Sequence, residues 1–136
     1  MKTFALDTNI ISYLLRSDPA VSVSARLTQE NDRGNMFIIP PLVYYEIKRG
    51  LLADNAKKWL RMFEDFCEDI SIGEMTLEMY DAAAQQYDNQ RRIGRPVGDA
   101  DLLIAAFCMV SGYTLVTNNT KHFEQIDGLQ ITNWTE

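Results

Sequence analysis

The stretch TFALDTN (residues 3–9) decides how the rest of the chain is interpreted. Four strand-forming residues, 3–6, are followed directly by Asp7, Thr8 and Asn9. A short apolar run stopped by polar residues is typical of a buried strand. In open α/β sheets, ligands lie outside the carboxyl ends of the strands, so Asp7 is the first candidate for chemistry. The competing interpretation is that Asp7 or Thr8 only caps the helix that residues 10–15 predict.

Composition indicates an ordinary soluble globular protein. The chain has 136 residues, 46% of them hydrophobic and 24% charged, so we expect residues 1–136 to form a single domain. No apolar run approaches the roughly 20 residues of a membrane span, and the N-terminus does not resemble a secretory signal, so a cytoplasmic location without membrane contact is expected. Cys67 and Cys108 have no second thiol nearby and predict free cysteines rather than a disulfide or a zinc site.

The net charge of −6 argues against a protein that coats nucleic acid by charge alone. The basic residues are nevertheless clustered, and eight of the thirteen lie in three groups. These are Lys48 and Arg49; Lys57, Lys58 and Arg61; and Arg91, Arg92 and Arg95.

Apolar strands alternate with helical patterns along the whole chain. Further strands are expected at residues 36–39, 70–72, 114–117 and 129–131. Helices are expected at residues 21–32, 41–51, 55–68, 76–94 and 102–112, with a helical turn at 121–125. Uninterrupted apolar strands that alternate with helices are typical of a parallel sheet covered on both faces. The sequence therefore predicts a three-layer α/β/α fold with a mainly parallel central sheet of four or five strands.

Four acidic residues fall where such a fold brings chain segments together. Asp7 ends the first strand, Glu46 lies near the start of the helix after the second, and Asp99 and Asp101 stand at the entry to the helix before the fourth. Gathered carboxylates repel one another unless a cation joins them. Oxygen ligands without a cysteine or histidine cluster predict Mg²⁺ or Mn²⁺, and such a site suits hydrolysis of phosphodiester bonds.

Simpler roles remain open for these acids. Asp99 could cap the helix that it precedes, and Asp101 could interact favourably with the helix dipole. Glu46 could pair with Lys48 or Arg49, although on a helix these neighbours point elsewhere.

Four segments in the same order resemble the PIN-domain family, and within it the VapC toxins of bacterial toxin–antitoxin pairs. They are LDTNII (residues 6–11), YEI with Gly50 (residues 45–50), GRPVG followed by DLLIAA (residues 94–106), and LVTNNTKHF (residues 115–123). The resemblance covers nearly the full length. It implies a PIN-like fold and a Mg²⁺-dependent endoribonuclease, with Mn²⁺ as the other candidate metal. Such toxins act on RNA, often tRNA.

The resemblance also assigns residues and partners. It places the metal ligands at Asp7, Glu46 and Asp101, with Asp99 as an accessory acid. It implies a homodimer and a VapB-type antitoxin that occupies the same groove. A fourth acid, usual in the wider family, is Asn119 here, which puts a second tightly held metal ion in question. The groups expected to orient the ligands are Thr8, Asn9, Thr117, Asn118 and Asn119, and those expected to contact RNA are Arg91, Arg92, Arg95 and Lys121.

Two other functions remain open. The DTN and GDAD segments loosely resemble phosphatases of the haloacid-dehalogenase type, in which the strand-ending Asp is a nucleophile. Those enzymes usually have a second acid two residues later, where this chain has Asn9. A PIN-like scaffold that binds RNA or protein without cutting is the other alternative.

Overall fold

A five-stranded sheet forms the centre of the molecule, a computed structural model that describes residues 1–16 and 21–136. The strands are β1 (Thr3–Leu6), β2 (Met36–Ile39), β3 (Ser71–Ile72), β4 (Thr114–Val116) and β5 (Ile131–Thr132). Their order is β3-β2-β1-β4-β5, and every neighbouring pair is parallel. The predicted α/β fold with a parallel sheet is therefore confirmed, and β1 takes the central position.

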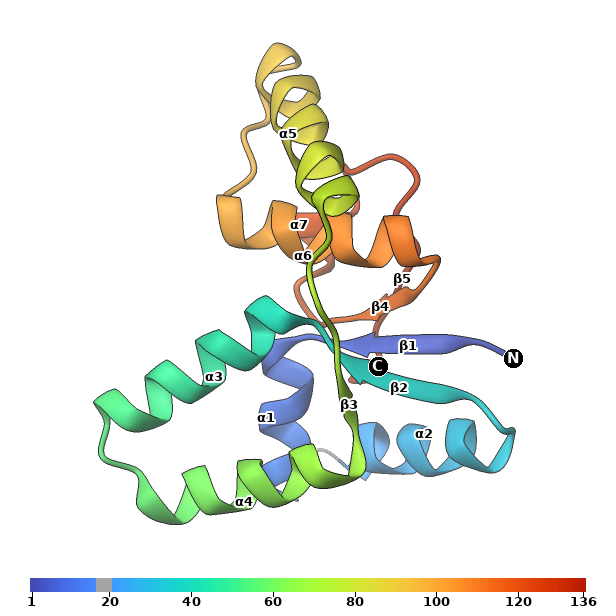
Figure 1. Ribbon diagram of the computed structural model, residues 1–136. Coiled ribbons are helices and arrows are strands. Elements are labelled where there is room, and N and C mark those ends of the chain that lie inside the picture. The colour runs from blue at the N-terminus through green and yellow to red at the C-terminus, as the bar shows by residue number, and fades with distance from the viewer. Residues whose placement is uncertain (17–20) are drawn as a thin grey trace.

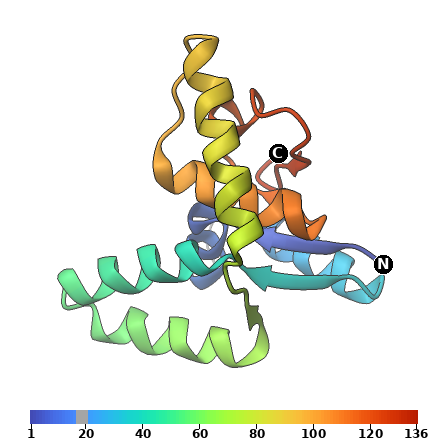
Figure 2. The same cartoon turned by 45° about the horizontal axis from the view of Figure 1, so that its top comes forward.

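Helices cover both faces of this sheet. They are α1 (Thr8–Arg16), α2 (Val21–Asp32), α3 (Pro41–Ala53), α4 (Lys57–Asp69), α5 (Leu77–Arg92), α6 (Asp99–Ser111) and α7 (Thr120–Phe123). In Figure 1, α1, α2 and α4 lie below the sheet, and α5 and α6 lie above it. Seen from a viewpoint turned by 45°, α3 and α4 remain side by side and α5 still projects beyond the layer formed by α6 (Figure 2).

The core explains why α6 sits against the sheet. Its residues Leu102 and Ile104 to Cys108 are all buried, as a helix that is apolar on every side requires. β1 is equally enclosed, since Phe4, Ala5 and Leu6 are at most 5% exposed. Trp134 and Phe123, which follow β4 in the chain, are also among the largest fully buried side chains.

Several helix starts differ from the sequence prediction by one to three residues, and two of these differences concern the acidic residues. Helix α1 begins at Thr8, directly after Asp7, because the Asp7 carbonyl accepts hydrogen bonds from the N–H groups of Ile10 and Ile11. Helix α6 begins at Asp99 rather than at residue 102, with Gly98 as its N-cap in an extended conformation. Asp99 is thus not the cap, and both Asp99 and Asp101 lie in the first helical turn, where acids interact favourably with the helix dipole.

The last turn of α5 also ends as glycine-stopped helices do. Gly94 follows the C-cap residue with φ +73°, a left-handed conformation that glycine adopts without strain. The N–H of Arg95 then bonds to the carbonyl of Gln90, which closes the helix end. This turn redirects the chain towards the start of α6.

None of the helices in the described ranges is both long enough and apolar enough to cross a membrane.

Candidate active site

Asp7 is the central acid of the candidate site, and it is only 5% exposed. Its Oδ1 accepts a hydrogen bond of 2.8 Å from the Thr8 backbone N–H. Its Oδ2 accepts one of 2.8 Å from the Thr117 hydroxyl and one of 3.3 Å from the Asn9 side-chain amide. Asp7 therefore does more than begin α1, because three donors hold its carboxylate at the carboxyl end of the central strand.

The segment after β4 is tied to the segment after β1. The Thr117 hydroxyl donates to Asp7 and accepts a 3.0 Å hydrogen bond from the Asn119 N–H. The Asn9 side-chain oxygen accepts a 3.1 Å hydrogen bond from the Asn118 N–H. All five residues predicted to orient the ligands thus belong to one hydrogen-bond network around Asp7. Asn118 and Asn119 join it through their backbone N–H groups, and Asn119 is exposed.

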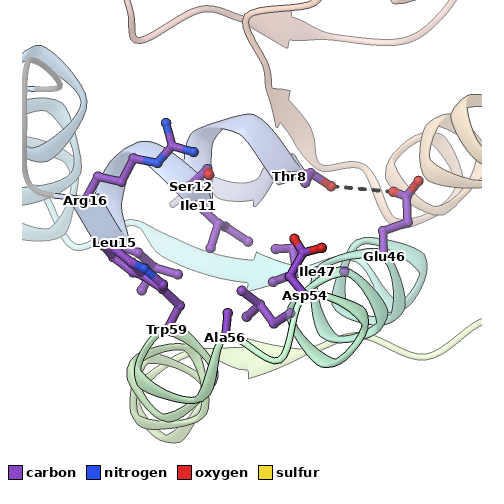
Figure 3. A pocket seen from close by; sticks show the side chains of 12 residues that line it. Thr8, Ile11, Ser12, Leu15, Arg16, Glu46, Ile47, Asp54, Ala56 and Trp59 are labelled. Carbon is purple, nitrogen blue, oxygen red and sulfur yellow. Dashed lines mark hydrogen bonds between the residues drawn. The ribbon is translucent and has the colours of Figure 1, made fainter.

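Glu46 approaches this centre from α3. The Thr8 hydroxyl donates a long hydrogen bond of 3.5 Å to its Oε1 (Figure 3). Burial and then the negative charges of Asp7 and Asp101 raise the pKa of the Glu46 carboxyl, while Arg49 and the Thr8 hydroxyl oppose the rise. The charge of Glu46 is therefore incompletely compensated by the protein.

Asp101 completes the group from α6. Burial raises its pKa, the negative charge of Asp7 adds to the rise, and the neighbouring His122 opposes it. The Nδ1 of His122 lies 3.4 Å from Asp101 Oδ2. His122 was not identified from the sequence, because its contact with Asp101 depends on how α7 packs against α6.

Asp99 and the predicted basic residues are placed differently. Asp99 is exposed, and its charge does not contribute to the raised pKa of either Glu46 or Asp101. Arg91 and Arg92 lie at the outer end of α5 and pair with Asp88 at 3.5 and 2.7 Å (Figure 1). Arg95 and Lys121 are exposed, in the segment before α6 and in α7.

The acids provide the donor chemistry that a hard divalent cation requires. In the described part of the chain, no three His, Cys, Asp or Glu side chains already form a cluster tight enough to hold a metal ion. The three carboxylates nevertheless act on one another through their charges. The nearby Cys108 is buried, and burial together with the charge of Asp7 raises the pKa of its thiol, so it offers no thiolate ligand. The donor set is therefore all oxygen, as Mg²⁺ and Mn²⁺ prefer.

A groove of about 460 Å³ opens beside these acids. It begins at Thr8 and Glu46 and passes between α1 and α3 to Trp59 on α4 (Figure 3). Ile11 and Leu15 form part of its largely apolar lining. Trp59 is 37% exposed, whereas Phe63 on the same helix is fully buried, so the large aromatic side chains of α4 are divided between groove and core.

Comparison with known proteins shows which family this chain belongs to. The profile of the PIN domain matches residues 4–129. The chain belongs to the PIN-domain family. The resemblance inferred from the sequence is therefore confirmed over nearly the whole length of this PIN domain.

Relatives of this PIN domain carry VapC names. The tRNA(fMet)-specific endonuclease VapC of Shigella flexneri is 32% identical, over 99% of this chain and 100% of the relative. Ribonuclease VapC1 of Haemophilus influenzae (strain R2866) is 29% identical, over 98% of both chains.

Solved structures agree with the fold. VapBC2 from Rickettsia felis, bound to a DNA fragment from its promoter, matches with a TM-score of 0.88 and 26% identity, covering 97% of this chain and 98% of that one. DNA-bound VapBC from Salmonella typhimurium matches with a TM-score of 0.87 and 27% identity, covering 98% and 99%.

Proposed function

We propose that this chain, as a single PIN domain of residues 1–136, is a metal-dependent ribonuclease toxin of the VapC type that hydrolyses phosphodiester bonds in RNA. One observation carries the proposal: carboxylates from β1–α1, α3 and α6 lie close enough together for their charges to oppose one another, and Thr8 bonds to both Asp7 and Glu46. The relatives named ribonuclease VapC support the same reaction class.

Asp7, Glu46 and Asp101 would hold Mg²⁺ or Mn²⁺ between them. A bound divalent cation supplies charge compensation for the carboxylates, activates water and stabilises the departing oxygen. Asp99 would be an accessory acid, in the same helical turn as Asp101. The neutral Asn119 replaces the fourth acid of the wider family, which favours one tightly held ion over two.

The chain itself fixes the ligand geometry. Thr117 and Asn9 donate to one oxygen of Asp7, and the Thr8 N–H donates to the other. Thr8 also reaches Glu46 through its hydroxyl. Groups that orient metal ligands in this way typically contribute about 10- to 100-fold to metal affinity or activity.

The substrate we propose is a structured RNA, with tRNA as the first candidate. The VapC relative from Shigella flexneri, whose name specifies tRNA(fMet), supports this choice. Of the predicted RNA contacts, Arg95 and Lys121 carry exposed side chains without an ion pair in the described residues. Arg91 and Arg92 would first have to leave Asp88, which costs little at an exposed surface.

We also propose a VapB-type antitoxin as the inhibitory partner and a homodimer as the toxin's assembly. The apolar groove from Glu46 to Trp59 adjoins the acids, so a protein segment bound in this groove would hinder the approach of RNA to the acids. The VapBC complexes among the solved structures support this partner class.

Cleavage of a tRNA(fMet) transcript by the purified chain tests the proposed activity. We expect cleavage with Mg²⁺, none with EDTA, and at least about a hundredfold slower cleavage for Asp7→Asn, because loss of a ligand should exceed loss of a group that only orients one. Asp81→Asn, the same change at an exposed acid of α5, is the matched control and should retain the rate of the unaltered chain. Circular dichroism should show the same fold for both variants.

Three results would overturn the proposal. Full cleavage by Asp7→Asn would exclude the site, and turnover of p-nitrophenyl phosphate without RNA cleavage would indicate a phosphatase. Metal-independent RNA binding without any cleavage would instead indicate a non-cutting module.

A further inference from the structure

An aromatic and a cationic side chain form an exposed pair on α3. Tyr45 is 54% exposed, as open to solvent as Tyr80 and Tyr87, which are each 52% exposed. The guanidinium carbon of Arg49, one helical turn later, lies 5.2 Å from the centroid of the Tyr45 ring. The pair therefore presents one π face and one positive charge together.

This pair lies at the rim of the candidate active site. Tyr45 directly precedes Glu46, and Arg49 follows Glu46 by three residues, so Arg49 and Glu46 are neighbours on the surface of α3. The guanidinium is thus close enough to act on the acid, yet the two form no ion pair within 4.0 Å. Arg49 remains available to another anion.

Three other arginines are engaged by neighbouring acids. Arg91 and Arg92 share Asp88, and Arg33 pairs with Glu30 at 2.6 Å. In the part of the chain that the structure describes, Arg49 has no acidic partner of this kind and stacks on a tyrosine instead.

We propose that Tyr45 and Arg49 form an RNA-binding platform beside the scissile bond, in which the tyrosine ring stacks on a base and the guanidinium binds an adjacent phosphate. This inference rests on the proposed ribonuclease function. The three carboxylates repel a polyanion such as RNA, so a substrate needs a positive charge beside them in order to approach. Single-stranded RNA is commonly held by aromatic side chains that stack on bases and by arginines that bind phosphates.

The test measures binding of a fluorescein-labelled tRNA(fMet) transcript in EDTA, where the RNA is not cut, and cleavage with Mg²⁺ in parallel. The variants are Arg49→Gln, Tyr45→Leu and Tyr45→Phe, with Lys2→Gln as the charge-matched control at the opposite end of β1. Because the altered side chains are exposed, urea unfolding should be nearly unchanged.

We expect Arg49→Gln and Tyr45→Leu each to raise the Kd at least about tenfold, while Tyr45→Phe and Lys2→Gln stay within about twofold. The slope of log Kd against log salt should fall by about 0.7–0.9 for Arg49→Gln and should not change for Tyr45→Leu. In cleavage, the loss should appear mainly in KM.

The possible outcomes separate this inference from the proposed function. A chain that cleaves RNA while Arg49→Gln and Tyr45→Leu bind as the unaltered chain does would overturn the platform alone. Binding without cleavage by the unaltered chain would overturn the nuclease proposal, and the variants would still decide the platform. A changed sedimentation behaviour with unchanged RNA affinity would assign the pair to a contact between copies of the chain and would also overturn it.

Discussion

The hydroxyl of Thr117 offers a direct test of how the fold holds Asp7. Thr117 is fully buried, donates a 2.8 Å hydrogen bond to the Asp7 carboxylate, and accepts one from the Asn119 N–H. Thr117→Val has nearly the same shape, so it removes this donor without opening a cavity. A hydrogen bond to a charged group contributes about 1.5–3 kcal/mol, and we expect the free energy of unfolding to fall by that amount.

Two controls separate the hydroxyl from packing. Thr117→Ser keeps the hydroxyl and loses one methyl group, which should cost about 1 kcal/mol through packing alone. Thr114→Val changes the first threonine of β4, whose hydroxyl bonds only to the exposed Gln130, and should cost less than about 0.5 kcal/mol. Urea unfolding followed by circular dichroism measures all three.

Function should separate these variants more sharply than stability does. Because Asp7 loses one of its orienting donors, Thr117→Val should weaken Mn²⁺ binding, measured by calorimetry, and RNA cleavage by about 10- to 100-fold. Thr117→Ser should retain both. If the valine and serine variants matched in metal affinity and cleavage, the inference that Thr117 positions Asp7 would be wrong.

Three further changes should alter stability in defined directions, each measured by urea unfolding. Gly73→Ala should destabilise by about 1–3 kcal/mol because its Cβ would overlap the Phe107 ring. Gly50→Ala, a helix-interior change whose Cβ meets nothing within 4 Å, should stabilise by about 0.5–1 kcal/mol. The opposite order would contradict the close packing of Gly73 against Phe107. Glu46→Gln in EDTA should stabilise the chain at pH 7. A carboxyl whose pKa is raised in the folded state contributes stability below its ordinary pKa, and this contribution is lost as the pH rises through the raised value. The extra stability of Glu46→Gln over the unaltered chain should therefore vanish near pH 4. With saturating Mn²⁺ at pH 7, the unaltered chain should have the higher free energy of unfolding, because the ion binds its folded state more tightly. If Glu46→Gln stayed the more stable, Glu46 would not be a ligand.

Much of the fold could be predicted because its signals are local. β1, β2 and β4 are short apolar runs, as strands buried on both faces must be, and α6 is apolar on every side. Helix starts were harder to predict, since Gly98 caps α6 with its backbone and lacks the side chain that usually marks an N-cap.

The candidate site was predicted unevenly. Asp7 was found because it ends the central strand, where parallel sheets bind ligands. The grouping of basic residues in the sequence drew attention to Arg91 and Arg92, but these face Asp88 on their own helix. Arg49 stood in another of these basic groups but was given no RNA contact, and His122 was given no role. Their importance comes from neighbours in space, since Arg49 stacks on Tyr45 and His122 on α7 reaches Asp101 on α6.

By itself, the sequence determined the alternation of strands and helices and the presence of acids at the ends of those elements, because burial and chain direction act on neighbouring residues. Only the tertiary structure decided which acids lie close to one another, and that Arg49 beside them forms no ion pair with the described residues. Those properties depend on distances between elements that lie up to about a hundred residues apart, as between Asp7 and Thr117, where the hydrogen bond spans 110 positions. The sequence gives the charge of each side chain, but the packing of the fold determines which groups lie near enough to compensate that charge.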